Sequence, residues 1–471
     1  MEAQTVASPV TRRRFLQGVA ATTAGIVLAA CQPAPTPTPV VVKQTVAVPQ
    51  TVVVAPSATP RPAAKPAKVV MMVDTGEFSD EALKRFLGGA KLVSEVERLA
   101  PDSTRLRAMW AAANPPDVWR ASGADVPLYA TYNWPLDLTE YFNTSTLLKP
   151  ADMAPAVDYF KYKGGWYGMH KDFSPDMSLI INAAAFEEVG APVPQEKKIY
   201  TYQDAAQWAR ALTRQEGNRT KRIGLAHPGW WDGDIQRILM EDGQDLFVDD
   251  FSKAKIKGNA RVEEVLAYFA RLSKDNVMWN PLNPSPSWAG DDLTAGRAGF
   301  TTMGYWMHGV VAGAKEPAAP KEKFQLRPAL SWGGKVAVNP PLGGAGWFIA
   351  RTTRVPQSAW ELFEHYMGGE PAKERARSGW GLPALKSLFS LMPQDTALSK
   401  QWYDAVMWEL ANTVQKPRTI NPFVATEVLN TAWNANLELY LKNQLKLEEA
   451  IANVDKEVNE AIKKRISALF G

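Results

Sequence analysis

The sequence predicts an α/β protein that follows an N-terminal region without globular character. From Val69 onward, short apolar runs alternate with segments whose apolar residues recur at helical spacing, and this alternation favours an α/β fold with largely parallel sheets. Hydrophobic residues make up 46% of the 471 residues and charged residues 22%, which is an ordinary globular composition. Before Val69 the chain carries a basic and apolar segment and then a proline-rich stretch, and neither pattern predicts a packed core.

Residues 1–31 have the pattern of an export signal. A basic segment with the pair Arg12-Arg13 precedes an apolar stretch, 18–30, that is too short to span a bilayer. The arginine pair is similar to a twin-arginine signal, and the sequence Leu-Ala-Ala-Cys31 is similar to a bacterial lipobox. We expect cleavage before Cys31 and lipidation of its thiol, which would anchor the protein to a membrane at the cell surface or in the periplasm. An ordinary signal with an incidental cysteine is the alternative.

Residues 32–68 predict a flexible linker. This stretch is rich in Pro, Thr, Val and Ala, and proline at such a density is incompatible with regular helices or sheets. An extended, polyproline-like tether is therefore expected. Because Cys31 is the single cysteine of the chain, a disulfide within the chain is excluded.

Helices and strands follow from Val69 in order. Val69–Val73 predicts a buried strand, and Ser79 is placed to cap the helix that follows it. Asn182 is expected to cap a helix over Ala183–Val189. Thr201 opens a helix with apolar residues at 205, 208, 209 and 212.

The second half continues the alternation. Asn259 opens another amphipathic helix, and Ala298–Met303 and Trp347–Ala350 are strand candidates bounded by glycines. The last seventy residues predict helices, with one apolar stripe running from Ala450 to Leu469.

Several kinds of chemistry are excluded or unsupported. A net charge of +4 is too small in this chain to indicate nucleic-acid binding. The four histidines lie far apart, which argues against a metal site. No HExxH, CxxC or GxSxG motif occurs, and the glycines at 343–346 precede a strand instead of following one, so no nucleotide cofactor is indicated. The adjacent carboxylates Asp291 and Asp292 are read as solvated groups and not as a glycosidase pair, so we expect no catalytic residues, cofactor or metal.

The tryptophans are the positive signal. All 17 lie between Trp110 and Trp433, and several sit beside glycine or where a strand meets a loop. Flat indole faces suit the apolar faces of sugar rings, although packing in the core is the alternative for each ring. The tryptophans at such positions are Trp119, Trp134, Trp166, Trp230, Trp231, Trp306, Trp347 and Trp380.

Six motifs occur in the order of one known family. They are Pro116–Trp119 with Pro135–Phe142, Gly165–Ser174, Ile180–Asn182 with Phe186–Gly190, Ala295–Phe300 with Gly304–Trp306, Leu342–Trp347, and Gly379–Ala384. On these motifs the chain from Val69 to Gly471 resembles the family 1 extracellular solute-binding proteins, the maltose-binding-like lipoproteins of bacterial ABC importers.

The resemblance implies a periplasmic-binding-protein-like fold of type II, in which two α/β lobes enclose a ligand cleft. The first lobe would comprise 69–172 and 344–385, and the second 173–343 and 386–471. The protein would be a monomer that captures a mono- or oligosaccharide and delivers it to the permease subunits of an ABC transporter. It would not be an enzyme.

The resemblance also implies ligand-binding residues. Trp119 would line the first lobe's side of the cleft, and Trp230 or Trp231 with Trp306 the second lobe's side. Trp347 and Asp172 would face the cleft, and Trp380 belongs to the last glycine-rich motif. Asp74 and Glu77 are further candidates, although the family has an aromatic residue at this place. His170 replaces the family's usual proline, and we interpret it as a hinge variant in preference to a ligand contact.

Three alternatives stay open. The same scaffold would bind a polyol phosphate or a polyamine if the cleft held a cluster of arginines or carboxylates, and no such cluster is evident in the sequence. A polysaccharide-processing enzyme would show turnover. A surface sensor would act without a permease.

Overall fold

The computed structural model describes residues 65–217, 219–341, 344–416 and 418–470. All of them belong to one compact unit, Pro62–Gly471. The predicted export signal, the lipidation site Cys31 and most of the predicted linker lie outside the described residues. Among the helices that are described, none is both long enough and apolar enough to cross a membrane.

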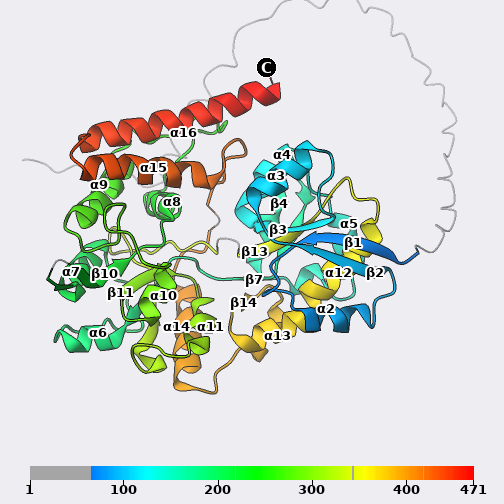
Figure 1. The fold of residues 1–471 in the computed structure, drawn as a ribbon, viewed down its shortest axis with the longest axis horizontal. Coiled ribbons are helices and arrows are strands. Elements are labelled where there is room, and N and C mark those ends of the chain that lie inside the picture. The colour runs from blue at the N-terminus through cyan, green and yellow to red at the C-terminus, as the bar shows by residue number, and fades with distance from the viewer. Residues whose placement is uncertain (1–64, 218, 342–343, 417, 471) are drawn as a thin grey trace, which may run out of the picture. The chain divides into compact units, whose positions relative to one another are not determined.

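Two five-stranded sheets organise the described chain (Figure 1). The first has the order β2-β1-β3-β13-β6, and the second has the order β12-β8-β11-β10-β9. The strands of the first are β2 (Val93–Leu99), β1 (Ala67–Met72), β3 (Val118–Ser122), β13 (Ala345–Ile349) and β6 (Gly168–His170). Those of the second are β12 (Phe324–Arg327), β8 (Ser178–Asn182), β11 (Ala298–Met303), β10 (Arg219–Ala226) and β9 (Arg214–Glu216).

The α/β class is confirmed, but the expectation of largely parallel sheets is wrong. Among the described strands, β1 runs parallel to β2 and β3, and β10 runs parallel to β11. The strand β13 is antiparallel to both of its neighbours, and β8 is antiparallel to β11 and β12. Strand direction depends on which distant segments become neighbours, and the alternation of apolar runs carries no information on that.

Each sheet has its own core and helices, so the compact unit consists of two lobes. The first-lobe core includes Val69, Trp119, Phe160, Trp347 and Phe363. Its helices are α2 (Asp80–Leu87), α3 (Ser103–Ala111), α4 (Val126–Thr131), α5 (Thr139–Thr144), α12 (Pro356–Gly368) and α13 (Glu370–Ser378).

The second lobe is larger and is built from two clusters of buried residues. Its helices are α6 (Ala183–Glu188), α7 (Tyr202–Leu212), α8 (Trp231–Glu241), α9 (Ala260–Lys274), α10 (Ala289–Thr294), α11 (Met307–Gly313), α14 (Ala397–Asn412), α15 (Thr426–Leu441) and α16 (Leu447–Phe470). The last two pack along each other, as Figure 1 shows in orange and red. The stripe of apolar residues in α16, from Ala450 to Ile462, is buried against this lobe.

The predicted helix starts hold at three of four positions. The side chains of Ser79, Thr201 and Asn259 each accept a backbone N–H at the start of α2, α7 and α9. Asn182 precedes α6, but its side chain makes no capping hydrogen bond. One boundary also differs, because β1 begins at Ala67, inside the range assigned to the linker.

Short strands connect the two lobes. The strand β7 (Asp172–Phe173) pairs with β14 (Leu382–Pro383), and both lie between the lobes in Figure 1. A second short pair, β4 (Lys161–Tyr162) with β5 (Gly165–Trp166), belongs to the first lobe.

Candidate binding cleft

Asp172 lies where the connecting segments meet. A Cβ atom added at Gly344 would lie 2.6 Å from the carbonyl oxygen of Asp172, and one added at Gly381 would lie 2.8 Å from its Cβ. Both distances are shorter than non-bonded carbon contacts allow, so the backbone approaches Asp172 this closely because both positions are glycine. The segments around Asp172 are therefore held together by close packing of their backbones.

Asp172 and Glu77, both predicted as ligand contacts, belong to one buried network of charges. Lys171 Nζ lies 2.9 Å from Asp172 Oδ2 and 3.7 Å from Glu77 Oε1, and Arg120 Nε donates to the same Glu77 oxygen at 2.8 Å. Burial lowers the pKa of Lys171, but the carboxylates of Asp172 and Glu77 outweigh burial and hold that pKa above its usual value. Asp172 Oδ2 and Glu77 Oε1 therefore already have partners from the protein, whereas Glu77 Oε2 is buried and has none among the described residues.

Trp119 and Trp347 lie in the core of the first lobe, which corrects the expectation that they face the cleft. Both rings are fully buried. Trp119 stacks on Phe348 with 5.2 Å between ring centroids, and Trp347 stacks on Tyr366 of α12 with 3.8 Å. Trp347 and Phe348 are consecutive in β13 and point to opposite faces of a sheet that is covered on both sides, so both faces are core.

A cavity of about 310 Å³, which we call the aromatic cavity, is lined by the second lobe and by Gly344 of the connecting segments, and two of the predicted tryptophans belong to its lining. Trp230 precedes α8 and is 37% exposed, and Trp306 precedes α11 and is half-buried. Trp288 stacks on Trp306 with 5.9 Å between ring centroids and 17° between planes, which supports the second ring. The cavity is lined by Asp176, Met177, Trp230, Asp232, Gly233, Trp306, Gly344, Arg418, Thr426, Glu427 and Asn430.

One wall of the aromatic cavity is a buried ion pair. Arg418 pairs with Asp232 Oδ2, and Asn430 Nδ2 donates to Asp232 Oδ1 at 2.9 Å. The backbone N–H of Asp232 in turn donates to Asn430 Oδ1 at 3.0 Å. Among the described residues, Arg418 Nε has no hydrogen-bond partner although it is buried. This wall therefore combines a buried ion pair with amide groups that hold Asp232 in place.

Asp176 provides a second polar group in the aromatic cavity. Burial raises the pKa of Asp176 well above its usual range, with Arg418 acting in the opposite direction. Ser174 Oγ donates to Asp176 Oδ1 at 3.3 Å. The oxygens of this carboxyl group can accept hydrogen bonds from the hydroxyl groups of a ligand.

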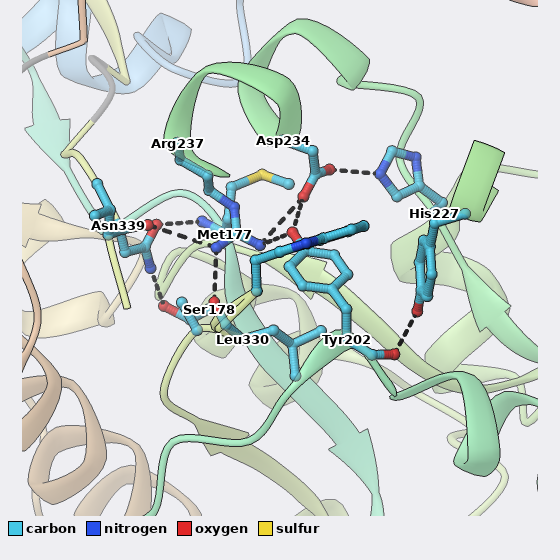
Figure 2. Close-up of polar contacts among 12 residues, drawn as sticks. Met177, Ser178, Tyr202, His227, Asp234, Arg237, Leu330 and Asn339 are labelled. Atoms are coloured by element: carbon cyan, nitrogen blue, oxygen red, sulfur yellow. Dashed lines mark hydrogen bonds and ion pairs between the residues drawn. The ribbon is translucent and has the colours of Figure 1, made fainter. Parts of the chain in front are cut away.

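A buried network of His227, Asp234 and Arg237 lies close to the turn that carries Trp230, and Figure 2 shows these three side chains. Gly229 has φ +83°, and its N–H donates to His227 Nδ1 at 3.0 Å. His227 Nε2 lies 2.7 Å from Asp234 Oδ2, and Arg237 Nη2 lies 3.1 Å from Asp234 Oδ1. Burial alone would raise the pKa of Asp234, but the hydrogen bond from His227 and the charge of Arg237 lower it below its usual value. The turn that carries Trp230 is therefore fixed by an ionised, fully buried carboxylate.

The other predicted residues do not line the aromatic cavity. Trp231 is buried and stacks on the His227 ring at 4.1 Å, and Trp380 is 41% exposed and packs against Gly309 of α11. Asp74 is exposed, and its Oδ1 accepts the backbone N–H of Gly76 at 2.7 Å. His170 is fully buried with its ring nitrogens near two backbone carbonyl oxygens, and burial lowers its pKa to about 4.

A second cavity of about 420 Å³ shares Glu427 with the aromatic cavity, and we call it the charged cavity. Charged side chains and tyrosines gather in it: Asp102, Arg107, Arg120, Asp125, Tyr129, Tyr132 and Glu427. Burial, and then the charge of Glu427, raise the pKa of Asp125 to about 7. The charged cavity takes its lining from both lobes, because Glu427 lies in the first turn of α15 whereas the other six residues belong to the first lobe.

Sequence reasoning missed most of the polar lining. Asp176, Asp232, Arg418, Glu427 and Asn430 come from three separate segments of the chain, and none belongs to a recognisable motif. Asp232 directly follows Trp230-Trp231 in the sequence. The reasoning that selected these two tryptophans therefore gives a local signal for Asp232, and for none of the other four residues. In the described part of the chain, no group of three or more His, Cys, Asp or Glu side chains is arranged to hold a metal ion.

Two α/β lobes joined by short connecting strands, with one cavity beside the connecting segments and another lined by both lobes, define a two-lobe ligand-binding protein. A sequence profile described as bacterial extracellular solute-binding protein matches residues 93–401, well over half of the chain. The chain belongs to this family of binding proteins, and membership implies a location outside the cytoplasm.

Similar proteins support the same fold. The lactose-binding protein of Rhizobium radiobacter is 23% identical over 297 residues, a match that covers 61% of this chain and 66% of that relative. An ABC substrate-binding protein of Listeria monocytogenes, solved with cycloalternan, has a TM-score of 0.69 at 20% identity and covers 84% of this chain and 98% of its own.

A solute-binding protein of Thermotoga lettingae bound to α-D-tagatose has a TM-score of 0.67 at 18% identity. The match covers 85% of this chain and 100% of that protein's chain. The sugar-binding protein MalE of Xanthomonas citri has a TM-score of 0.64 at 18% identity. The match covers 85% of this chain and 99% of that protein's chain. These likenesses confirm the predicted two-lobe fold.

Proposed function

We propose that this protein is a membrane-tethered, non-enzymatic receptor that captures a carbohydrate outside the cytoplasm and delivers it to the permease of an ABC importer. The observation that carries the proposal is the aromatic cavity, where Trp230 and Trp306 accompany hydrogen-bonding groups beside the segments that connect the lobes. Indole faces stack on sugar rings, and polar groups at the rim bind hydroxyls. The family and the sugars named for the similar proteins point the same way.

The charges in the aromatic cavity are partly compensated. Asp232 and Arg418 form an ion pair, and burial raises the pKa of Asp176. Glu427 is the remaining carboxylate of the lining. The clustered charges of the charged cavity, which the sequence did not reveal, are the observation that would support a charged solute such as a polyamine or a polyol phosphate. Carboxylates and guanidinium groups occur there together, so no single sign of charge dominates.

A thermal-shift screen against a carbohydrate library, followed by calorimetry, tests the proposal. Ligand at about 100 times its dissociation constant is expected to stabilise the protein by roughly 2.7 kcal/mol. Calorimetry should give one site per chain, and prolonged incubation should leave the sugar unchanged. Turnover of the sugar would instead identify an enzyme.

Salt dependence separates neutral from charged ligands. Stacking and hydrogen bonds to hydroxyl groups depend little on ionic strength, whereas attraction between opposite charges is screened. The affinity for the identified sugar should therefore stay within about twofold between low and physiological salt. A tenfold loss over the same range, or stabilisation by polyamines but by no sugar, would favour the charged-solute alternative.

A further inference from the structure

The C-terminal helix α16 reaches from the second lobe to the first. Its residues Ile451, Val454, Val458 and Ile462 are buried in the core of the second lobe, and the fully buried stripe ends there. Arg465 follows, and its guanidinium lies 3.7 Å from the centroid of the Tyr132 ring, at the end of α4 in the first lobe. In Figure 1 the red C-terminal end of α16 accordingly lies near α4.

The contact between Arg465 and Tyr132 is a cation–π contact. Burial raises the pKa of Tyr132 above its usual value, although the charges of Arg465 and Arg107 act in the opposite direction. The phenol therefore carries no charge at neutral pH, and the face of its ring attracts the cation. Arg465 is half-buried, and among the described residues its Nε atom is buried without a hydrogen-bond partner. A guanidinium partly removed from water gains more from an aromatic face than a fully exposed one does.

Tyr132 is supported by a cluster of rings in the first lobe. Its ring centroid lies 5.0 Å from that of Trp134. Trp134 in turn stacks between Trp110, at 5.0 Å, and Tyr129, at 5.2 Å. Rings packed on one another in this way restrict the movement of Tyr132, so its face is offered to Arg465 at a defined position.

Beside this contact, the lobes are separated by a cavity and not by packed side chains. Tyr132 lines the charged cavity on the first lobe, and Ala425 and Glu427 line it on the second. Neither Arg465 nor Tyr132 lines the aromatic cavity. Residues of α15 do line that cavity, and α16 packs along α15, so the contact is one helix away from the candidate binding site.

We propose that Arg465 and Tyr132 form a latch, which holds the two lobes close to each other before any ligand binds. The contact breaks when the lobes move apart, because its two halves belong to different lobes. It should shift the equilibrium between approached and separated lobes about two- to fivefold toward the approached state. A ligand that contacts both lobes then finds a larger fraction of the protein ready to bind it, whatever the chemical class of that ligand.

Distances between spin labels in the ligand-free, full-length chain test the latch. The labels are attached at Ala111→Cys in α3 and Ala435→Cys in α15, one on each lobe. Both alanines are exposed, and they line neither the aromatic nor the charged cavity. Cys31→Ser removes the single natural cysteine, so that only the two introduced thiols react. Double electron–electron resonance then gives the ratio of short to long distances between the lobes.

Two variants remove the latch, and two matched controls retain it. Arg465→Gln removes the charge and keeps much of the stem, and Tyr132→Leu removes the aromatic face. Each should shift the ratio about two- to fivefold toward the longer distance. Tyr132→Phe keeps the ring, and Lys464→Ala removes the exposed cation next to Arg465, so both should match the parent. The double variant Arg465→Gln/Tyr132→Leu should shift the ratio no further than either single variant, because both substitutions remove the same contact.

The latch is overturned by unchanged distances in Arg465→Gln, or by a double variant whose shift is the product of the two single shifts. An equal shift in Lys464→Ala also overturns it, because the net charge of α16 would then be the cause. Thermal unfolding checks that each variant is folded, and if Tyr132→Leu is not, Arg465→Gln against Lys464→Ala decides. Because no ligand is present, failure of the latch leaves the proposed carbohydrate receptor intact.

Discussion

Trp306 and Trp347 carry the same type of side chain, but the surroundings of the two rings differ. Trp306 follows the last residues of β11 by way of Gly304, so its ring leaves the sheet and lines the aromatic cavity. Trp347 lies inside β13, and its ring is clamped against Tyr366 with 2° between planes. Position relative to the strand end decides between a ligand-facing ring and a core ring.

Substitution of Trp306 and Trp347 by alanine should therefore give opposite results. Trp306→Ala removes a stacking surface for the sugar and should weaken binding by about 2–4 kcal/mol, or thirty- to several-hundredfold, with a near-native melting temperature. Trp347→Ala leaves a cavity in the core and should cost about 3–5 kcal/mol of stability. Calorimetry and thermal unfolding of both variants measure the two effects. A large loss of stability in Trp306→Ala with unchanged affinity would show that this ring is structural.

Asp125 should make stability depend on pH. Its pKa is raised to about 7 in the folded protein and is near 4 when unfolded, so the folded state binds the proton more tightly. The resulting stabilisation is fully present below about pH 4 and is lost as pH rises through about 7.

Asp125→Asn removes this pH dependence. The amide oxygen still accepts the Ser122 N–H, and no charge is buried, so the variant should gain roughly 2 kcal/mol relative to the parent between pH 5 and pH 8. Urea unfolding at both pH values measures the difference. Parallel pH profiles for the two proteins would show that Asp125 is not the titrating group.

At the scale of elements, α8 delivers Trp230 and Asp232 to the aromatic cavity. The turn before it depends on Gly229 at φ +83°, and the helix is followed by Gly243 at φ +68°. A Cβ added at either glycine meets no atom within 4 Å, so an alanine costs backbone strain alone at both. The two ends of one helix thus provide a matched pair of sites.

Gly229→Ala and Gly243→Ala should be similarly destabilised, by about 1 kcal/mol. Gly229→Ala should also weaken sugar binding several-fold, because the strained turn shifts Trp230, whereas Gly243→Ala should bind as the parent does. Thermal unfolding and calorimetry on both provide the comparison. Equal affinities would mean that the turn does not set the position of Trp230.

Local elements were predictable from the sequence to a greater extent than the cleft. The capping side chains of Ser79, Thr201 and Asn259 and the bounds of β11 follow from nearby residues. The ion pair of Asp232 with Arg418 joins residues 186 apart, and nothing local signals it. The prediction that Trp119 faces the cleft is wrong, because the sequence around a tryptophan in a strand does not show whether the sheet is covered on one face or on both.

At the scale of the whole molecule, the predicted anchor concerns a part of the chain outside the described residues. One lipidated thiol would carry the attachment, and the proline-rich sequence of residues 32–68 has no apolar run long enough to replace it. Cys31→Ser should therefore move the protein from the membrane to the soluble fraction while leaving sugar affinity unchanged. Immunoblots of fractionated cells measure the distribution, and unchanged membrane association would refute the lipoprotein prediction.

The distribution of tryptophans has an optical consequence. Among the 17 indoles, Trp230, Trp288 and Trp380 are the most exposed, whereas rings such as Trp119, Trp347, Trp402 and Trp433 are inaccessible to solvent. Acrylamide should therefore quench a small, red-shifted part of the emission and leave the intense blue emission of the core rings unaffected. Because Trp230 and Trp306 line the aromatic cavity, a bound sugar should protect that red-shifted part from the quencher, and the protein's own fluorescence then reports occupancy of the cleft.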